Sequence, residues 1–386
     1  MALTGMALTG MTSTGMISTS PRDARRSDSS LLVSIQWLRA IAALLVVVFH
    51  TLYYANTLAD RFGDPEINTS WFSAWWFGFH IFFVVSGFIM IRTTTDFGAP
   101  GAPQRFLLRR IVRVVPLYWL LSVPLAIGAI VAPQAFGITT NKYGYVAFSY
   151  LFIRVARAGD DLRPLLGQGW TLDYEMFFYF AFALAMLLPR RWGIGALTVI
   201  FAGLVLMGRY LRIGTDSPIL FTFTDDMILE FLFGVYIGLA YEKGFRIPGW
   251  LAAVAVIAGF VWVAPDPSGP TFIINGLPAA LVVGGFVFGP RLSGSAATRW
   301  LERIGDASYS LYLTHTFILR PYRDVWIATV GNSLPAALYL ITAILIAVLL
   351  GLVVYRFVER PMTRFLRRRF IDHATPVPAQ VAATTA

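Results

Sequence analysis

Apolar runs recur along this sequence, and many reach roughly twenty residues, the length that lets a helix cross the hydrocarbon core of a bilayer. Hydrophobic residues make up 57% of the chain and charged residues only 13%, a balance unlike that of a soluble domain. Inside a bilayer, backbone polar groups must find their partners within the protein, and a helix pairs them within its own segment. We therefore predict an all-α, polytopic membrane protein.

We expect about ten transmembrane helices, judged by the length of the apolar runs. Residues 143–153 are apolar too, but about 11 residues suit a re-entrant or interfacial piece better than a span. The tails at 1–30 and 366–386 are predicted to be disordered, which leaves a membrane domain at 31–365. The expected spans are 34–55, 71–91, 110–131, 170–188, 193–210, 218–240, 249–264, 271–289, 307–327 and 334–356.

The distribution of positive charge predicts how the chain is oriented. The net charge is +10, but the arginines stand in short loops beside apolar runs, so we expect no nucleic-acid partner. With the N-terminus inside, roughly 21 of the 31 Lys and Arg residues fall on the inner side. Both termini are therefore predicted to be cytoplasmic. The chain has no cysteine, which excludes disulfides and thiolate nucleophiles.

The first span carries an arginine near one end and a histidine near the other. Arg39 and His50 are eleven residues apart, so a helix places them about 16 Å apart along its axis and on nearly the same face. The predicted orientation puts Arg39 near the inner face of the membrane and His50 near the outer face. Ionisable groups at such depth are costly and indicate function. The alternative is that each side chain simply reaches the nearer interface.

Arginines gather at the start of the third span. Arg105, Arg109 and Arg113 recur at every fourth residue, and Arg110 lies beside them. Guanidinium groups bind phosphate through paired hydrogen bonds, so this stripe could hold a polyphosphate donor such as a coenzyme A ester. The alternative is that these arginines set the topology and contact anionic lipids.

Two carboxylates begin the span at 170–188, between Trp170 and Tyr179. Asp173 suits stabilisation of the helix start through the helix dipole. Glu175 lies deeper, and we expect it to orient a histidine from another helix as an acid–base partner.

Three more ionisable residues lie within apolar runs. His80 lies near the start of the second span, on the outer side. Glu230 needs a cation or a proton, with Arg39 as one candidate partner. His315 shares a helix face with Tyr312, and this polar seam indicates a lined cavity or hydrogen bonds between helices. A purely structural role is the alternative for each of the three.

The motifs described above belong to seven stretches that follow one another along the chain. Together, over about residues 31–365, these stretches resemble the membrane-bound acyltransferase family 3. Within this family, the pattern of motifs is most similar to that of the exopolysaccharide acetyltransferases of soil bacteria. His80 departs from the pattern, because an Asp is frequent there, so a carboxylate role is not carried over. The matching stretches are Arg39 through His50, Phe82 through Phe88, Arg109 through Arg113 with Pro116, Tyr118 and Trp119, Trp170 through Leu172 with Glu175, Phe178 and Tyr179, Glu230 through Leu232 with Gly234, Gly305 with Ser308, Tyr309, Tyr312, Leu313 and His315, and Glu359 through Pro361.

The resemblance implies transfer of an acyl group, most often acetyl, from cytoplasmic acyl-coenzyme A to a hydroxyl of a surface polysaccharide or lipid-linked sugar. The enzyme would be a multi-pass protein of the bacterial inner membrane, surrounded by lipids, with acetyl-coenzyme A as co-substrate and no permanently bound cofactor or metal. His50 would be the general base or the nucleophile, Glu175 would orient it, and Arg39 would fix the pantetheine arm or pair with Glu230. Acyl-coenzyme A would contact Arg109, Arg110, Arg113, Glu230 and His315, and the acceptor would contact His80, Trp170, Asp173 and Tyr179.

The sequence is also compatible with two other classes of function. Ten spans with buried His, Glu and Arg residues could form a sugar transporter or a proton-coupled transporter. Against this, the pattern at 170–179 has no counterpart in the other half of the chain, so no inverted repeat is visible. The third possibility is an inactive scaffold in a polysaccharide-synthesis complex.

Overall fold

The computed structural model describes residues 21–63, 77–159, 161–262, 270–292, 294–331 and 333–371, with side chains from residue 31 onward. Within these ranges the regular structure is helical, apart from one isolated bridge between Ala158 and Asp161. This confirms the predicted all-α class. Residues 1–20 and 372–386 of the expected tails, and parts of the expected spans 71–91 and 249–264, lie outside the described residues.

The described helices vary widely in length. Short 3₁₀ turns occur at Pro133–Phe136 (η2) and Gly167–Gly169 (η3), and π-helical turns at Phe272–Gly276 (η4) and Tyr355–Glu359 (η5). The α-helices are α1 (Pro21–Phe62), α2 (Gly78–Thr93), α3 (Ala102–Val131), α4 (Lys142–Tyr150), α5 (Trp170–Ala185), α6 (Arg190–Tyr210), α7 (Pro218–Thr224), α8 (Ile228–Glu242), α9 (Gly249–Trp262), α10 (Leu277–Phe288), α11 (Arg299–Asp306), α12 (Ser308–Thr329), α13 (Ala336–Val354) and α14 (Arg360–Phe370).

Four of the described helical segments are long and apolar enough to cross a membrane, so the expected count of about ten is not confirmed. They are Leu31–Phe62, Ala102–Val131, Arg190–Tyr210 and Ala336–Phe370. One reason lies in the expected span 218–240, which divides into α7 and α8. Asp225 accepts a hydrogen bond from the backbone N–H of Met227 (2.9 Å) and stabilises the break. Shorter apolar helices occupy Gly78–Thr93, Gly249–Trp262 and Phe272–Phe288.

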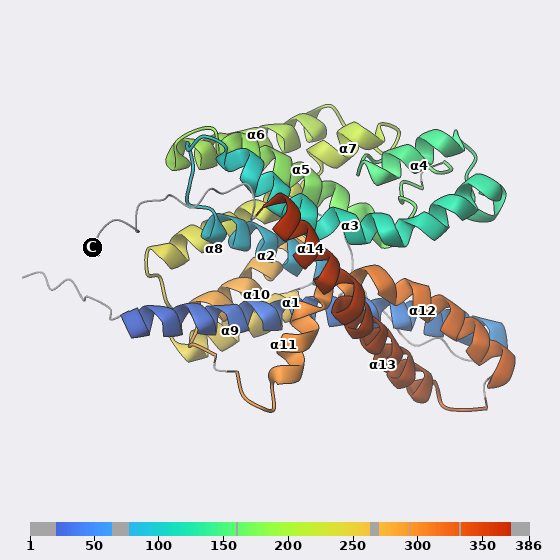
Figure 1. Ribbon diagram of the computed structural model, residues 1–386. Coiled ribbons are helices and arrows are strands. Elements are labelled where there is room, and N and C mark those ends of the chain that lie inside the picture. The colour runs from blue at the N-terminus through green and yellow to red at the C-terminus, as the bar shows by residue number, and fades with distance from the viewer. Residues whose placement is uncertain are drawn as a thin grey trace, which may run out of the picture.

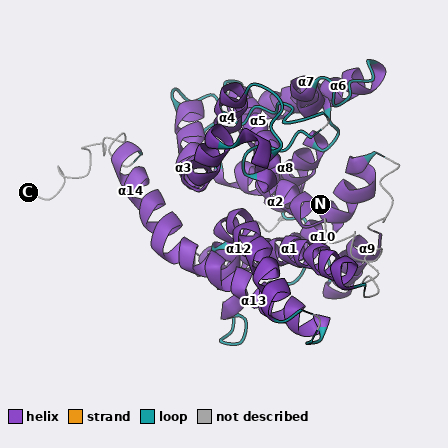
Figure 2. Ribbon diagram, turned by 90° about the vertical axis from the view of Figure 1, so that its right-hand side faces the viewer, coloured by secondary structure: helices purple, strands orange, loops and turns teal. Residues whose placement is uncertain are grey.

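The helices also extend beyond the expected limits of the membrane domain. The helix α1 already begins at Pro21, ten residues before the expected boundary at 31. At the other end, α13, η5 and α14 form one continuous segment of 35 residues that ends at Phe370. Figure 2 shows this segment as a single long rod along one edge of the molecule. Within the apolar 143–153 stretch the helix is α4 (Lys142–Tyr150), and its nine residues are too few to span a bilayer.

The helices form two groups, with α2 and α8 between them. Figures 1 and 2 both show α3–α7 on one side and α1 with α9, α10, α12 and α13 on the other. The pair α2 and α8 runs parallel and packs unusually closely. A Cβ atom on Gly87 would lie 2.0 Å from the backbone oxygen of Phe231, and one on Gly234 would lie 1.9 Å from that of Val84. Only glycine allows two helix backbones to approach in this way.

Replacing Gly234 with alanine is therefore expected to lower the melting temperature of the detergent-solubilised protein, since the added methyl group would force α2 and α8 apart. Overpacking of this kind costs about 1–3 kcal/mol. Gly203 on α6 is the matched control, because a Cβ atom there meets no atom within 4 Å. Gly203→Ala should leave stability unchanged or raise it slightly. Equal melting temperatures for the two variants would contradict the close packing of α2 on α8.

Candidate active site

Two cavities lie one after the other along the helix axes. The first, called here the His50 cavity, has a volume of about 670 Å³ and is lined by His50, Gln168 and Trp170 among others. The second, the Arg110 cavity, has a volume of about 110 Å³ and is lined by Arg110, Glu175 and their neighbours. Phe79 and Tyr312 line both cavities, so these two side chains form the wall between them.

On each helix that contributes to both cavities, one stretch of residues lines the Arg110 cavity and the next stretch lines the His50 cavity. On α1, Arg39 lines the Arg110 cavity and His50 the other. On α12, Ser308 and Tyr309 line the Arg110 cavity and Tyr312 lies at the wall. The residues of α12 that line the His50 cavity are Thr316, Phe317, Arg320 and Pro321. Eleven residues of helix separate Arg39 from His50, so the cavities are stacked over a distance of about 16 Å.

His50 lies beside a second histidine. Its Nδ1 is 2.9 Å from the backbone oxygen of Val46 and 3.3 Å from Nε2 of His315. The Nδ1 atom of His315 is 3.2 Å from the backbone oxygen of Leu311. A carbonyl oxygen only accepts, so both histidines carry their proton on Nδ1 when neutral. In that state Nε2 of His315 is a second acceptor for the Nδ1–H group of His50, and Nε2 of His50 has a free lone pair.

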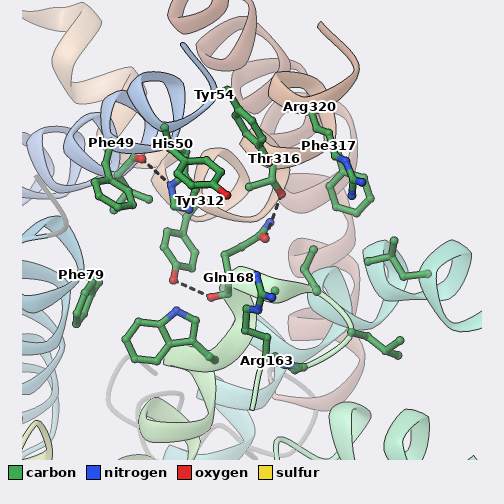
Figure 3. A pocket seen from close by; sticks show the side chains of 18 of the residues that line it. Phe49, His50, Tyr54, Phe79, Arg163, Gln168, Tyr312, Thr316, Phe317 and Arg320 are labelled. Atoms are coloured by element: carbon green, nitrogen blue, oxygen red, sulfur yellow. Dashed lines mark hydrogen bonds between the residues drawn. The ribbon is translucent and has the colours of Figure 1, made fainter. Parts of the chain in front are cut away.

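A hydrogen-bonded network holds the wall between the cavities. The hydroxyl of Tyr312 donates to the backbone oxygen of Gln168 (2.7 Å) and lies 2.7 Å from Oγ1 of Thr171. The side chain of Gln168 donates to the backbone oxygen of Leu313 (2.7 Å) and accepts from Oγ1 of Thr316 (3.1 Å). Figure 3 shows Tyr312, Gln168 and Thr316 joined in this way below His50. The turn before α5 is thereby fixed to α12.

The Arg110 cavity gathers three guanidinium groups around one carboxylate. Arg39 on α1 and Arg110 and Arg113 on α3 line it together with Glu175 on α5. Glu175 accepts hydrogen bonds from the hydroxyl of Tyr179 and from Oγ of Ser86 (3.0 Å). The guanidinium of Arg110 lies over the ring of Tyr179, 5.6 Å from its centroid. The lining therefore carries an excess of positive charge.

Glu175 does not orient His50, contrary to expectation. It lines the Arg110 cavity, and the neighbour that the structure gives to His50 is His315. The reason is geometric: Glu175 lies more than a full turn into α5, whereas the residues of this segment that line the His50 cavity are those at its start, such as Trp170. Tyr179, expected on the acceptor side, lies still deeper and also lines the Arg110 cavity.

Glu230 and His80 pair with each other, and neither lines a cavity described above. The Nδ1 atom of His80 is 2.7 Å from Oε1 and 2.8 Å from Oε2 of Glu230, and both side chains are buried. Glu230 is therefore paired with His80 and not with Arg39, and neither side chain reaches the lining of the His50 cavity or the Arg110 cavity. The close parallel packing of α2 on α8 brings the two residues together instead.

Asp173 and Arg109 also lie apart from the cavity linings. Asp173 is buried and accepts a hydrogen bond from Nε of Arg154 (3.3 Å), while Nη2 of Arg154 donates to the backbone oxygen of Trp170 (2.7 Å). This pair anchors the loop before α5. Arg105 and Arg109 are absent from the lining, so of the predicted arginine stripe only Arg113 reaches the Arg110 cavity, joined by its neighbour Arg110.

The sequence assigned no individual role to two kinds of lining residue. Gln168 precedes the fourth expected span in a polar, glycine-flanked turn, which is a usable signal for a binding loop. Arg157, Arg163 and Arg320 line the His50 cavity, but nothing in their spacing links residues so far apart in the sequence. Within the described ranges, no group of three or more His, Asp or Glu side chains is arranged to hold a metal ion.

The fold and these cavities define an all-helical membrane protein with a histidine in one chamber and a basic cluster in the next. Residues 32–370 match the acyltransferase domain family. The chain belongs to this family and is therefore an acyltransferase. No solved structure shows a significant match to it.

Three named relatives illustrate the range of the family. The chain is 32% identical over 299 residues to the exopolysaccharide production protein ExoZ of Rhizobium meliloti, a match that covers 76% of this chain and 90% of ExoZ. It is 24% identical to the peptidoglycan O-acetyltransferase OatA of Listeria monocytogenes, over 86% of this chain and 56% of OatA. It is 24% identical to the acyltransferase MdmB of Streptomyces mycarofaciens, over 90% of this chain and 96% of MdmB.

Proposed function

We propose that this protein is an O-acetyltransferase of the bacterial inner membrane. It moves an acetyl group from acetyl-coenzyme A, held at the Arg110 cavity, to a hydroxyl of a polysaccharide or lipid-linked sugar in the His50 cavity. The observation that carries this proposal is the shared wall of Phe79 and Tyr312, because it places a basic chamber and a histidine chamber in direct succession.

The basic chamber suits the donor. Arg39, Arg110 and Arg113 converge from two helices, and guanidinium groups bind phosphate oxygens through paired, charge-assisted hydrogen bonds. Glu175 is fixed by Ser86 on α2 and by its own helix neighbour Tyr179, so its charge offsets part of the arginine charge without closing the chamber. A coenzyme bound here would direct its thioester arm toward the wall and His50.

The larger chamber suits a sugar acceptor. Its lining combines aromatic rings, among them Phe49, Tyr53 and Trp170, with a few polar groups such as Gln168 and Thr316. Predominantly apolar walls with a small number of placed hydrogen-bonding groups are typical of small-molecule sites.

His50 supplies the chemistry in this proposal. Its Nε2 lone pair takes the proton of the acceptor hydroxyl as the oxygen attacks the thioester carbonyl. The new C–O bond replaces the C–S bond, and the proton then passes from the imidazolium to the departing thiolate. His315 stabilises the imidazolium through its Nε2 atom, 3.3 Å from Nδ1 of His50. An acetyl group carried transiently on His50 is the alternative route, and it uses the same residue.

The orientation is part of the proposal. Positive charge in the short loops favours cytoplasmic termini and about ten crossings, which puts the Arg110 cavity toward the cytoplasm, where the coenzyme is present. The His50 cavity then faces outward, toward the acceptor. The names of ExoZ and OatA, an exopolysaccharide production protein and a peptidoglycan O-acetyltransferase, support an acceptor outside the cytoplasm.

A transporter is the competing function, since two stacked cavities also describe a transport pathway. Purified protein in liposomes separates the two. The enzyme is expected to move label from acetyl-coenzyme A onto a glycan acceptor, with release of free coenzyme A. Movement of sugar across the liposome membrane without any acetylation would instead indicate a carrier.

A further inference from the structure

The His50 cavity has a basic lining that acetyl transfer to a neutral sugar does not require. Arg157, Arg163 and Arg320 all line it, and its lining contains no Asp or Glu among the described residues. These arginines come from the loop before α5 and from α12, so tertiary structure alone brings them to one cavity. Figure 3 shows Arg163 and Arg320 among the lining side chains, on different elements.

Asp161 neutralises only part of this charge. It accepts hydrogen bonds from Nε (2.9 Å) and Nη2 (2.8 Å) of Arg163, and it also pairs with Arg157. The hydrogen bond from the Arg163 side chain lowers the pKa of Asp161 to about 2, so this carboxylate is ionised at neutral pH. One carboxylate against three guanidinium groups leaves an excess of two positive charges at the cavity.

Arg320 is the arginine best placed to bind a ligand. It is exposed, and the structure gives it no ion pair with any described residue. Its neighbour Arg323, by contrast, is paired with Asp324 (2.6 Å). Arg320 follows His315 by five residues on α12, which is about 7.5 Å along the helix axis. Arg320 and His50 line the same cavity, so a group bound by Arg320 would share the chamber in which His50 activates the hydroxyl.

We propose that the acceptor is an anionic glycan, and that Arg320, assisted by Arg163, binds its negatively charged group beside the reacting hydroxyl. This inference rests on the acetyltransferase function proposed above and names the chemical class of its acceptor. The shared chemistry is a carboxylate or phosphate that a guanidinium group can hold through paired hydrogen bonds. Its source is either an acidic sugar of the glycan or the diphosphate of a lipid-linked precursor.

The test uses the full-length protein in liposomes with three acceptors: an oligosaccharide that contains one glucuronic acid, the same oligosaccharide after reduction of its carboxyl group, and a prenyl-diphosphate-linked neutral sugar. Wild type is expected to prefer an anionic acceptor. Arg320→Gln should raise the KM for that acceptor roughly tenfold, the effect of one charge-assisted hydrogen bond. The kcat value and the KM for the reduced oligosaccharide should not change.

Two further variants sharpen the comparison. Arg320→Lys keeps the charge and should recover most of the lost affinity. Arg61 near the end of α1 is exposed and lies outside the cavity lining, so Arg61→Gln should behave as wild type and exclude a general effect of surface charge. If Arg320→Gln raises the KM for the glucuronate acceptor alone, the bound anion is that of an acidic sugar. If it raises the KM for the diphosphate acceptor alone, the bound anion is that of the lipid-linked precursor.

Binding is measured separately from catalysis, as the shift in melting temperature that each acceptor causes. Stabilisation by an anionic acceptor that Arg320→Gln removes would support the anion site even if no acceptor were acetylated, a result that would contradict only the proposed function. Equal KM values and equal thermal shifts for the charged and the reduced oligosaccharides, together with no response to the diphosphate, would overturn the inference.

Discussion

His50→Ala is expected to abolish acetyl transfer while the protein remains folded and inserted in the membrane. Loss of a general base costs roughly 10²- to 10⁴-fold in rate, and loss of a nucleophile would cost at least as much. The imidazole lines a cavity, and its hydrogen bonds are to the backbone oxygen of Val46 and to His315. Its removal should therefore disturb the packing of the helices little. The measurement is the initial rate of label transfer from acetyl-coenzyme A, with size-exclusion chromatography to verify the fold.

A matched pair of variants at His315 tests whether this residue acts through His50. Glutamine at this position can still offer an oxygen to the Nδ1–H group of His50, whereas leucine cannot. We therefore expect His315→Gln to retain more of the kcat value than His315→Leu, with the KM for acetyl-coenzyme A unchanged in both. Near-normal acetylation by His50→Ala would contradict the mechanism. Equal activity of the two His315 variants would show that His315 does not act through His50.

Arg110→Gln and Arg113→Gln are expected to raise the KM for acetyl-coenzyme A, each roughly tenfold, because each removes a charge-assisted contact with phosphate. The KM for the glycan acceptor should not change, since neither side chain lines the His50 cavity. The measurement is a full kinetic matrix in which both substrate concentrations are varied.

Arg109→Gln is the control for these two variants. Arg109 lies on the same helix and carries the same charge, but it is exposed and outside the cavity lining. Its donor KM should equal that of wild type. An unchanged donor KM in Arg110→Gln and Arg113→Gln would mean that these arginines serve only topology and lipid contact.

Features that depend on a single helix could be predicted from the sequence. The eleven-residue interval between Arg39 and His50 placed both on one face of α1, and the structure shows that both line the stacked cavities. The seam of Tyr312 and His315 on α12 likewise predicted a lined cavity or hydrogen bonds between helices. Tyr312 does both, since it lines the two cavities and bonds to Gln168 and Thr171. Helical periodicity alone fixes such relations.

Partners on different helices could not be predicted. Glu175, His80 and Glu230 were all recognised as ionisable groups in apolar surroundings, but their pairing depends on which helices become neighbours. The close approach of α2 and α8 at Gly87 and Gly234 joins His80 to Glu230, and no local pattern reports that contact. The expected count of about ten spanning helices is also not confirmed within the described residues, for a related reason. Apolar length does not reveal a break such as the one that Asp225 stabilises.

The most direct test of the central claim uses liposomes with labelled acetyl-coenzyme A enclosed on one side and the glycan acceptor supplied only on the other. For protein inserted with its Arg110 cavity toward the enclosed coenzyme, the account predicts that the label appears on the external glycan while free coenzyme A stays inside. His50→Ala liposomes should show neither product. Acetylation only when donor and acceptor share one side of the membrane would contradict transfer between the two cavities.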